Sequence, residues 1–301
     1  MIDAAVIGLR WVQYLAAVAA LGLPLFGIYG FRNRPSGPVA GISVAAGLLL
    51  AAGALGGIVA QTAMMAGDWT AALDLAALGY VVQSTSLGMA HIIRAALAVI
   101  GVIALLINQS SRAGSTLAIL AFGGAVASFA WSGHGAATEG AEGLFHLAAD
   151  IAHLLAAAVW LGALAGFCLM LARPLKGEIE ESARSLAGFA TVGTVTVAVL
   201  TVTGLVNSAF LVGLEGSGRL ASSAWGLLLL AKLGLFAVMV WLAAHNRYVL
   251  TPELDRAIAQ GSETGGPVKS LRISIGLELA AGVVLLGLVA AMGVQMPPAS
   301  M

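Results

Sequence analysis

The chain has 301 residues, of which 60% are hydrophobic and only 9% are charged. Soluble domains carry about 25% charged residues, so this composition excludes a soluble globular protein. The formal net charge is zero, which gives no sign of a basic surface for nucleic acid, and the single cysteine, Cys168, excludes an internal disulfide framework. We therefore expect an all-α, polytopic integral membrane protein with one transmembrane domain over residues 1–301 and no nucleic-acid partner.

Apolar runs along the chain predict about eight transmembrane helices, because each crossing needs about 20 apolar residues. The first run follows Asp3, an acidic residue where a cleavable signal peptide carries positive charge, so we expect this run to be a span. The expected spans are residues 4–31, 39–67, 86–108, 115–133, 144–172, 186–212, 223–248 and 271–295.

The connections between these spans are short and leave no room for a separate soluble module. Residues 69–82 (WTAALDLAALGYVV) are amphipathic and are expected to lie on the membrane surface. Residues 173–185 are expected to form a charged connector, and residues 249–270 a polar, glycine-rich loop. A G-x-x-x-G pair, Gly162 and Gly166, predicts close packing against a neighbouring helix.

Lysine and arginine predict the orientation of the bundle, because loops that face the cytoplasm are enriched in both. With eight spans, the loops on one side carry ten of these residues and the loops on the other side carry only Arg219. The richer side is expected to face the cytoplasm, which puts both termini outside, in the periplasm of a bacterium with an inner membrane. The ten residues are Arg32, Arg34, Arg112, Arg173, Lys176, Arg184, Arg247, Arg256, Lys269 and Arg272.

Ionisable side chains within the spans are candidates for function, because burying them in hydrocarbon costs several kcal/mol unless they are partnered or hydrated. All of them except Glu278 fall in the predicted outer half, and His134 lies at the outer end of span 115–133. This clustering predicts one hydrated polar cavity that opens to the outside. The intramembrane residues are Arg10, His91, Arg94, His146, Asp150, His153, Lys232 and Glu278, with Gln13, Gln61 and Asn207 at a depth similar to that of the outer group.

The span at 144–172 has the most regular arrangement of such residues. His146, Asp150 and His153 are spaced i, i+4 and i+7, which places them within roughly 60° of arc on one helix face, and Trp160 continues that face. At 1.5 Å per residue, His153 lies about 10 Å deeper than His146. A face of that length predicts a track along the helix rather than a single ligand shell.

Imidazole binds copper, zinc, iron and nickel, and thioether sulfur adds a preference for Cu(I). Methionines occur at the predicted outer surface, and Asp150 is placed to orient the neighbouring imidazoles, as carboxylates do for histidine ligands. The sequence therefore predicts a copper site, for Cu(I) or Cu(II). The candidate ligands are His134, His146, His153, His91, Met64 and Met65, with Asp150, Trp160, Arg94, Lys232, Gln61 and Asn207 in support.

Other interpretations of the same residues stay open. The histidines and Asp150 can form a purely structural hydrogen-bond network, and Arg94 and Lys232 can neutralise Asp150. A membrane cytochrome with haem b held between His91 and a histidine of span 144–172 is one alternative. A copper sensor or scaffold that moves no metal is another. A nucleotide-binding loop and the common hydrolase motifs are absent from the sequence, so we expect a transport or binding protein rather than an enzyme.

Two neighbouring stretches, SGHGAA at 132–137 and LFHLAADIAHLLAAAVWLGAL at 144–164, resemble the signature of the copper resistance protein D (CopD) membrane family. Three shorter stretches agree: HIIRAALAVI at 91–100, LLLLAKLGLF at 227–236 and AHNRYVLTPEL at 244–254. The CopD-like region extends from about residue 80 to residue 280 or 295. The matching positions are His134, His146, Asp150, His153 and Trp160, with Arg94, Lys232, Asn246 and Arg247 as supporting polar positions.

The resemblance implies a multi-pass protein of the bacterial inner membrane that moves copper from the periplasm to the cytoplasm. It also implies a separate periplasmic copper-binding partner of the CopC type. On this basis we expect copper to be captured near His134, His146 and Met64/Met65, to move to His153, and then to cross a tight, apolar inner half. A negative-inside membrane potential favours such entry by about 2.3 kcal/mol per charge per 100 mV.

Overall fold

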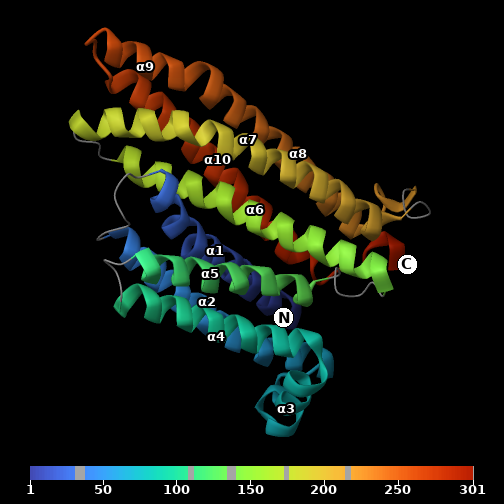
Figure 1. Ribbon diagram of the computed structural model, residues 1–301. Helices are drawn as coiled ribbons and strands as arrows, with labels where there is room; N and C mark the ends of the chain where they lie inside the picture. The colour runs from blue at the N-terminus through green and yellow to red at the C-terminus, as the bar shows by residue number, and fades with distance from the viewer. Residues whose placement is uncertain (31–37, 108–111, 134–139, 173–175, 214–217, 301) are drawn as a thin grey trace.

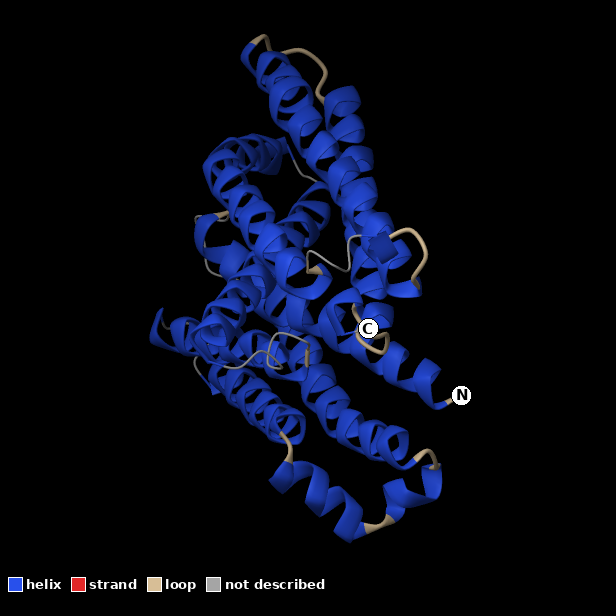
Figure 2. Ribbon diagram, turned by 90° about the vertical axis from the view of Figure 1, so that its right-hand side faces the viewer, coloured by secondary structure: helices blue, strands red, loops and turns tan. Residues whose placement is uncertain are grey.

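A computed structural model describes residues 1–30, 38–107, 112–133, 140–172, 176–213 and 218–300. Within these ranges every regular element is helical, as Figure 2 shows. Eight helical segments are long and apolar enough to cross a membrane, which confirms the prediction of a polytopic helix bundle. The elements are α1 (Ile2–Tyr29), α2 (Pro38–Ala66), η1 (Trp69–Leu73), α3 (Leu75–Ser84), α4 (Ser86–Ile107), α5 (Arg112–Ala127), η2 (Ser128–Ser132), α6 (Gly140–Ala172), α7 (Lys176–Val212), α8 (Ala224–His245), η5 (Asn246–Leu250), α9 (Thr251–Ala259), α10 (Gly265–Met292) and η6 (Pro298–Ser300).

Two predicted connections are wrong in part, because helices extend through them. Residues 176–185 form the first turns of α7 rather than a charged connector. Residues 249–259 continue from α8 through the π-helical η5 into α9, and α10 begins at Gly265, so only residues 260–264 fit the predicted loop. Pro252 lies in the first turn of α9, directly after the π-helical turn η5, where the regular α-helical hydrogen-bond pattern is already interrupted.

The long helices form two groups that meet along α1 and α6 (Figure 1). The N-terminal group contains α1, α2, α4 and α5, and the C-terminal group contains α6, α7, α8 and α10. Helix α1 packs against α6 and α10 as well as against α2, so it joins the two groups. The N- and C-termini lie at the same end of the bundle, which we call the terminal end (Figure 1). Sequence reasoning expects this end to face outside.

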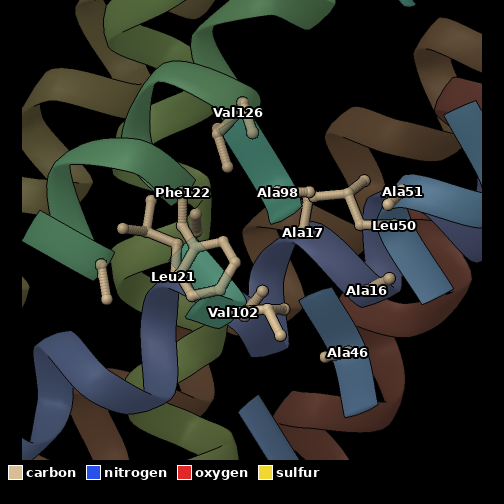
Figure 3. Close-up of a cluster of buried hydrophobic side chains, with 14 of the residues drawn as sticks. Ala16, Ala17, Leu21, Ala46, Leu50, Ala51, Ala98, Val102, Phe122 and Val126 are labelled. Atoms are coloured by element: carbon tan, nitrogen blue, oxygen red, sulfur yellow. The ribbon is translucent and has the colours of Figure 1, made fainter. Parts of the chain in front are cut away.

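Small residues allow the helices of the N-terminal group to approach one another closely. Figure 3 shows Ala16 and Ala17 of α1 facing alanines of α2 and α4, with the Phe122 ring filling the space beside Val102. A Cβ atom added at Gly101 would lie 2.6 Å from the Phe122 ring, so only glycine leaves room for the ring there. This core is apolar, and the polar side chains described below lie outside it.

The closest approach between the two groups is the crossing of α1 and α6. A Cβ atom added at Gly22 would lie 2.5 Å from the Cα atom of Gly162, and one at Gly166 would lie 2.2 Å from the Phe26 ring. The G-x-x-x-G pair therefore packs against α1, as its spacing predicts. This contact fixes the position of α6, which carries the candidate site.

Candidate functional site

His146, Asp150 and His153 all face α7, so the structure places them on one face of α6, as their spacing predicts. The His146 ring stacks on Phe210, with ring centroids 4.5 Å apart and planes 6° from parallel. Asp150 Oδ1 accepts a hydrogen bond from Asn207 Nδ2 at 3.2 Å. His153 Nδ1 lies 2.9 Å from Thr203 Oγ1. We call these three α6 residues the α6 histidine face.

Thr203 determines which nitrogen of His153 is available to a ligand. Its hydroxyl donates to the backbone oxygen of Val199 at 2.6 Å, so Oγ1 accepts the hydrogen bond from His153 Nδ1–H. The neutral ring then carries its lone pair on Nε2. A histidine that donates one ring N–H to an oxygen and keeps the other nitrogen free has the arrangement typical of metal ligands.

His153 lines a cavity of about 610 Å³ between α6, α7, α8 and α10, which we call the His153 cavity. Its wall is mostly apolar, with Lys232, Thr201 and Ser208 among the polar residues. Lys232 lies within electrostatic range of Asp150, and it is the cation that balances this carboxylate. Within the described residues, no three His, Cys, Asp or Glu side chains converge as a metal cluster.

Sequence reasoning missed Met239, a buried residue of α8 that also lines the His153 cavity. Its thioether is a soft donor of the kind that Cu(I) prefers. The sequence gives little signal for it, because a methionine within an apolar span resembles any other core residue.

Arg94 is held by the N-terminal group and makes no ion pair with Asp150. Its guanidinium donates to Gln13 Oε1 at 3.0 Å, to Ser128 Oγ at 3.1 Å and to Ser132 Oγ at 2.9 Å. It also lies 3.6 Å from the centroid of the Phe129 ring. These partners are all neutral, so Arg94 stabilises the packing of α1, α4 and η2. Of the two cations predicted to neutralise Asp150, Lys232 is the one that lies within electrostatic range of it.

His91 faces a different interface from that of the α6 histidine face. Its Nδ1 lies 2.8 Å from the backbone oxygen of Leu87, and a Cβ atom added at Gly57 of α2 would lie 2.7 Å from its Nε2. One turn further along α2, Gln61 Oε1 is buried without a hydrogen-bond partner among the described residues. His91 and Gln61 therefore belong to a polar cluster between α2 and α4, which adjoins Gln13, the hydrogen-bond partner of Arg94.

The expectation of one outer cavity that contains every candidate ligand is thus not met. Met64 and Met65 lie at the end of α2, which packs against α1, α4, η1 and α3, away from α7. The histidine pair required for haem is also split, since His91 faces α2 whereas His146 and His153 face α7. His134 lies outside the described residues.

Beyond the His153 cavity, Trp160 forms a hydrogen bond with Glu278, the one ionisable residue that the sequence places in the inner half. Its Nε1–H donates to Glu278 Oε1 at 2.8 Å, and Asn246 Nδ2 donates to Glu278 Oε2 at 2.9 Å. A second cavity of about 450 Å³, the Glu278 cavity, lies on this side and also has Arg247 and Asp255 in its wall. The expectation of a tight, apolar inner half is therefore wrong.

Trp160 lines both cavities and so forms a partition between them. The indole is 3% exposed and meets the Phe236 ring edge-on, with centroids 5.9 Å apart. The α6 face predicted from sequence thus leads from His146 past His153 to an aromatic barrier with a carboxylate behind it.

Two protein-family descriptions match this chain. The N-terminal domain of copper resistance protein D-like proteins matches residues 1–144, and the copper resistance protein D family matches residues 183–292. A copper resistance protein D from Pseudomonas syringae pv. tomato is 39% identical over 310 residues, which cover 99% of this chain and 98% of that protein.

Two further relatives match in part. The inner membrane protein YebZ of Escherichia coli is 33% identical over 42% of this chain and 43% of its own length. The copper transport protein CutJ of Bacillus subtilis is 26% identical over 82% of this chain and 47% of its own length. No solved structure matches. The identity over the whole chain and the two family matches show that this protein belongs to the copper resistance protein D family.

Proposed function

We propose that this protein carries copper ions across the bacterial inner membrane, from the periplasm to the cytoplasm, along the α6 histidine face. The observation that carries the proposal is the state of His153. This residue lies inside a membrane span, lines the His153 cavity and keeps Nε2 as its free nitrogen because Thr203 binds Nδ1. A neutral imidazole held in this way is ready to bind a copper ion.

The charges around the α6 histidine face suit a passing cation. Asp150 lies between the two histidines and offsets part of the cost of holding a positive ion within the membrane. Lys232 lies within electrostatic range of Asp150 and offsets its charge before the ion enters. Met239 offers a soft sulfur at the same cavity.

The direction of transport follows from the predicted orientation. The terminal end, where the α6 histidine face begins, is expected to face the periplasm, and a negative-inside potential then favours inward movement of a cation by about 2.3 kcal/mol per charge per 100 mV. A separate periplasmic protein of the CopC type would deliver the ion to this end.

Metal analysis and the visible absorption spectrum of the purified protein test the proposal against its rivals. The proposal is supported if the purified protein contains copper and shows no haem absorption. His153→Gln is expected to reduce the amount of bound copper. A Soret band that is lost in His91→Gln and in His153→Gln would overturn it in favour of a membrane cytochrome.

A further inference from the structure

The side chain of Glu278 is a buried carboxylate without a cationic partner. It is 1% exposed, and its two oxygens accept hydrogen bonds from Trp160 and Asn246, both of them neutral donors. Within the described part of the chain, no ion pair reaches it. An ionised carboxylate is costly to bury in this way unless a positive charge accompanies it.

The charged groups nearest to Glu278 do not supply that charge. Arg247 lines the same cavity, but its guanidinium donates to the backbone oxygen of Ala190 at 3.1 Å and to Thr194 Oγ1. Asp255 is exposed at the mouth of the cavity, and Cys168 lies on α6 within electrostatic range. Lys232 and His153 line the His153 cavity, on the other side of the Trp160 partition.

Two more oxygens near this carboxylate have no hydrogen-bond partner among the described residues. Asn246 Oδ1 belongs to a side chain that is 8% exposed and lines the Glu278 cavity. Ser274 Oγ belongs to a side chain that is 7% exposed and lies one helical turn before Glu278 on α10. Buried oxygens are rarely left without a partner, so both are available to a ligand.

The backbone at Asn246 is also unusual. Asn246 is the first residue of η5, the π-helical turn between α8 and α9, and η5 packs against α10. Single π-helical turns within α-helices occur frequently at functional sites. Here the turn directs the Asn246 amide toward Glu278.

The donor atoms at this place are all oxygen. A carboxylate, an amide and a hydroxyl suit hard cations, whereas Cu(I) prefers imidazole and thioether. Among the described residues that line the Glu278 cavity there is no histidine, cysteine or methionine. A copper ion that passes Trp160 would therefore find no soft ligand in the wall of this cavity, which suits release, and the carboxylate is left for a different ion.

We propose that Glu278, with Asn246 and Ser274, forms a binding site for a hard monovalent cation, either a proton or a sodium ion, at the closed end of the Glu278 cavity. A proton needs the carboxylate alone, and a sodium ion uses the amide and hydroxyl oxygens as well. Trp160 bonds to Glu278 and also lines the His153 cavity, so the binding of a cation at Glu278 is linked to a residue in the wall of the copper path. Only this link to copper movement rests on the proposed function.

Infrared difference spectra of the full-length protein in lipid, without copper, test the site directly. The two comparisons are a pH step in choline buffer and the replacement of choline by sodium at fixed pH. The wild type is expected to show the loss of a protonated-carboxyl band when pH rises, and Glu278→Gln is expected to lack that band. Asp255→Asn, which changes an exposed carboxylate of the same cavity, is expected to keep it.

The sodium comparison identifies the ion. If sodium also removes the band at fixed pH, the site binds sodium, and if sodium leaves the band unchanged, it binds a proton. Asn246→Ala keeps the carboxyl group. This variant is expected to weaken sodium binding about tenfold, the loss that removal of a supporting partner commonly causes, or to move the pH midpoint of the same band.

Identical spectra for the wild type and Glu278→Gln under both steps would overturn the site. Copper uptake is then measured separately in liposomes that contain the wild type, at varied internal pH and sodium concentration. A wild type that moves no copper would contradict the proposed function, and the infrared result would still decide the cation site on its own.

Discussion

Trp160 on α6 donates its indole N–H to the carboxylate of Glu278 on α10 over 2.8 Å, and the same ring lines the cavities on both of its sides. The α6 face that begins with two histidines thus ends at a partition between a cavity with soft donors and a cavity with oxygen donors only. An ion that follows this face must pass the partition to reach the opposite end of the bundle.

Replacing Trp160 tests the partition as a structural element. Trp160→Phe removes the indole donor and leaves one buried oxygen of Glu278 without its partner, so we expect the free energy of unfolding to fall by about 1–3 kcal/mol. Trp241→Phe is the matched control, because Trp241 is 65% exposed and its ring stacks on His245. Denaturant titrations in detergent would measure both, and equal stability of the two variants would contradict the role of the bond.

Thr203 is expected to control the affinity of His153 for copper. Thr203→Val keeps the shape of the side chain but removes the acceptor for Nδ1–H, so the ring is no longer held in one tautomer. We expect a 10- to 100-fold loss of copper affinity, measured by competition with a chelator. Thr201→Val is the control, since Thr201 also lines the cavity but its hydroxyl donates to the backbone oxygen of Val197. Wild-type affinity in Thr203→Val would count against this role.

The two polar clusters are expected to behave independently. His91→Gln changes the cluster between α2 and α4 and should leave copper affinity within about twofold of the wild type, because His91 faces α2 whereas the proposed ligands face α7, and residues without shared partners act independently. His146→Gln, on the α6 histidine face, should lower that affinity. A larger loss in His91→Gln than in His146→Gln would instead favour the single cavity that the sequence predicts.

The crossing of α1 and α6 is expected to tolerate no side chain. Gly162→Ala places a Cβ atom 2.3 Å from the Cα atom of Gly22, so the helices must separate. Such overpacking costs about 1–3 kcal/mol, occasionally more. Gly8→Ala is the control on α1, because nothing lies within 4 Å of a Cβ atom there. Thermal unfolding would show the difference, and similar melting temperatures for the two variants would mean that the contact is not tight.

The eight spans and the α6 histidine face could be predicted from sequence because both depend on local information. Hydropathy reports each span on its own, and His146, Asp150 and His153 share a face by spacing alone. Their partners on α7, at Phe210, Asn207 and Thr203, could not be predicted, since sequence spacing does not show which helix packs on that face.

Contacts over long sequence separation account for most of what the sequence did not predict. Glu278 meets Trp160 from 118 residues away, and no local pattern connects them. The helix through 249–259 was missed because Pro252 and nearby charges indicate a loop, whereas the structure buries Leu254 against the bundle. The prediction of a single outer cavity was wrong for a similar reason, because residues at equal depth in the membrane can lie at different helix interfaces.

Copper uptake into proteoliposomes with a negative-inside potential tests the central claim most directly. Wild-type protein is expected to move copper inward, His153→Gln to reduce the initial rate by at least about tenfold, and Thr201→Val to retain the wild-type rate. Wild-type copper flux in His153→Gln would contradict a path along the α6 histidine face.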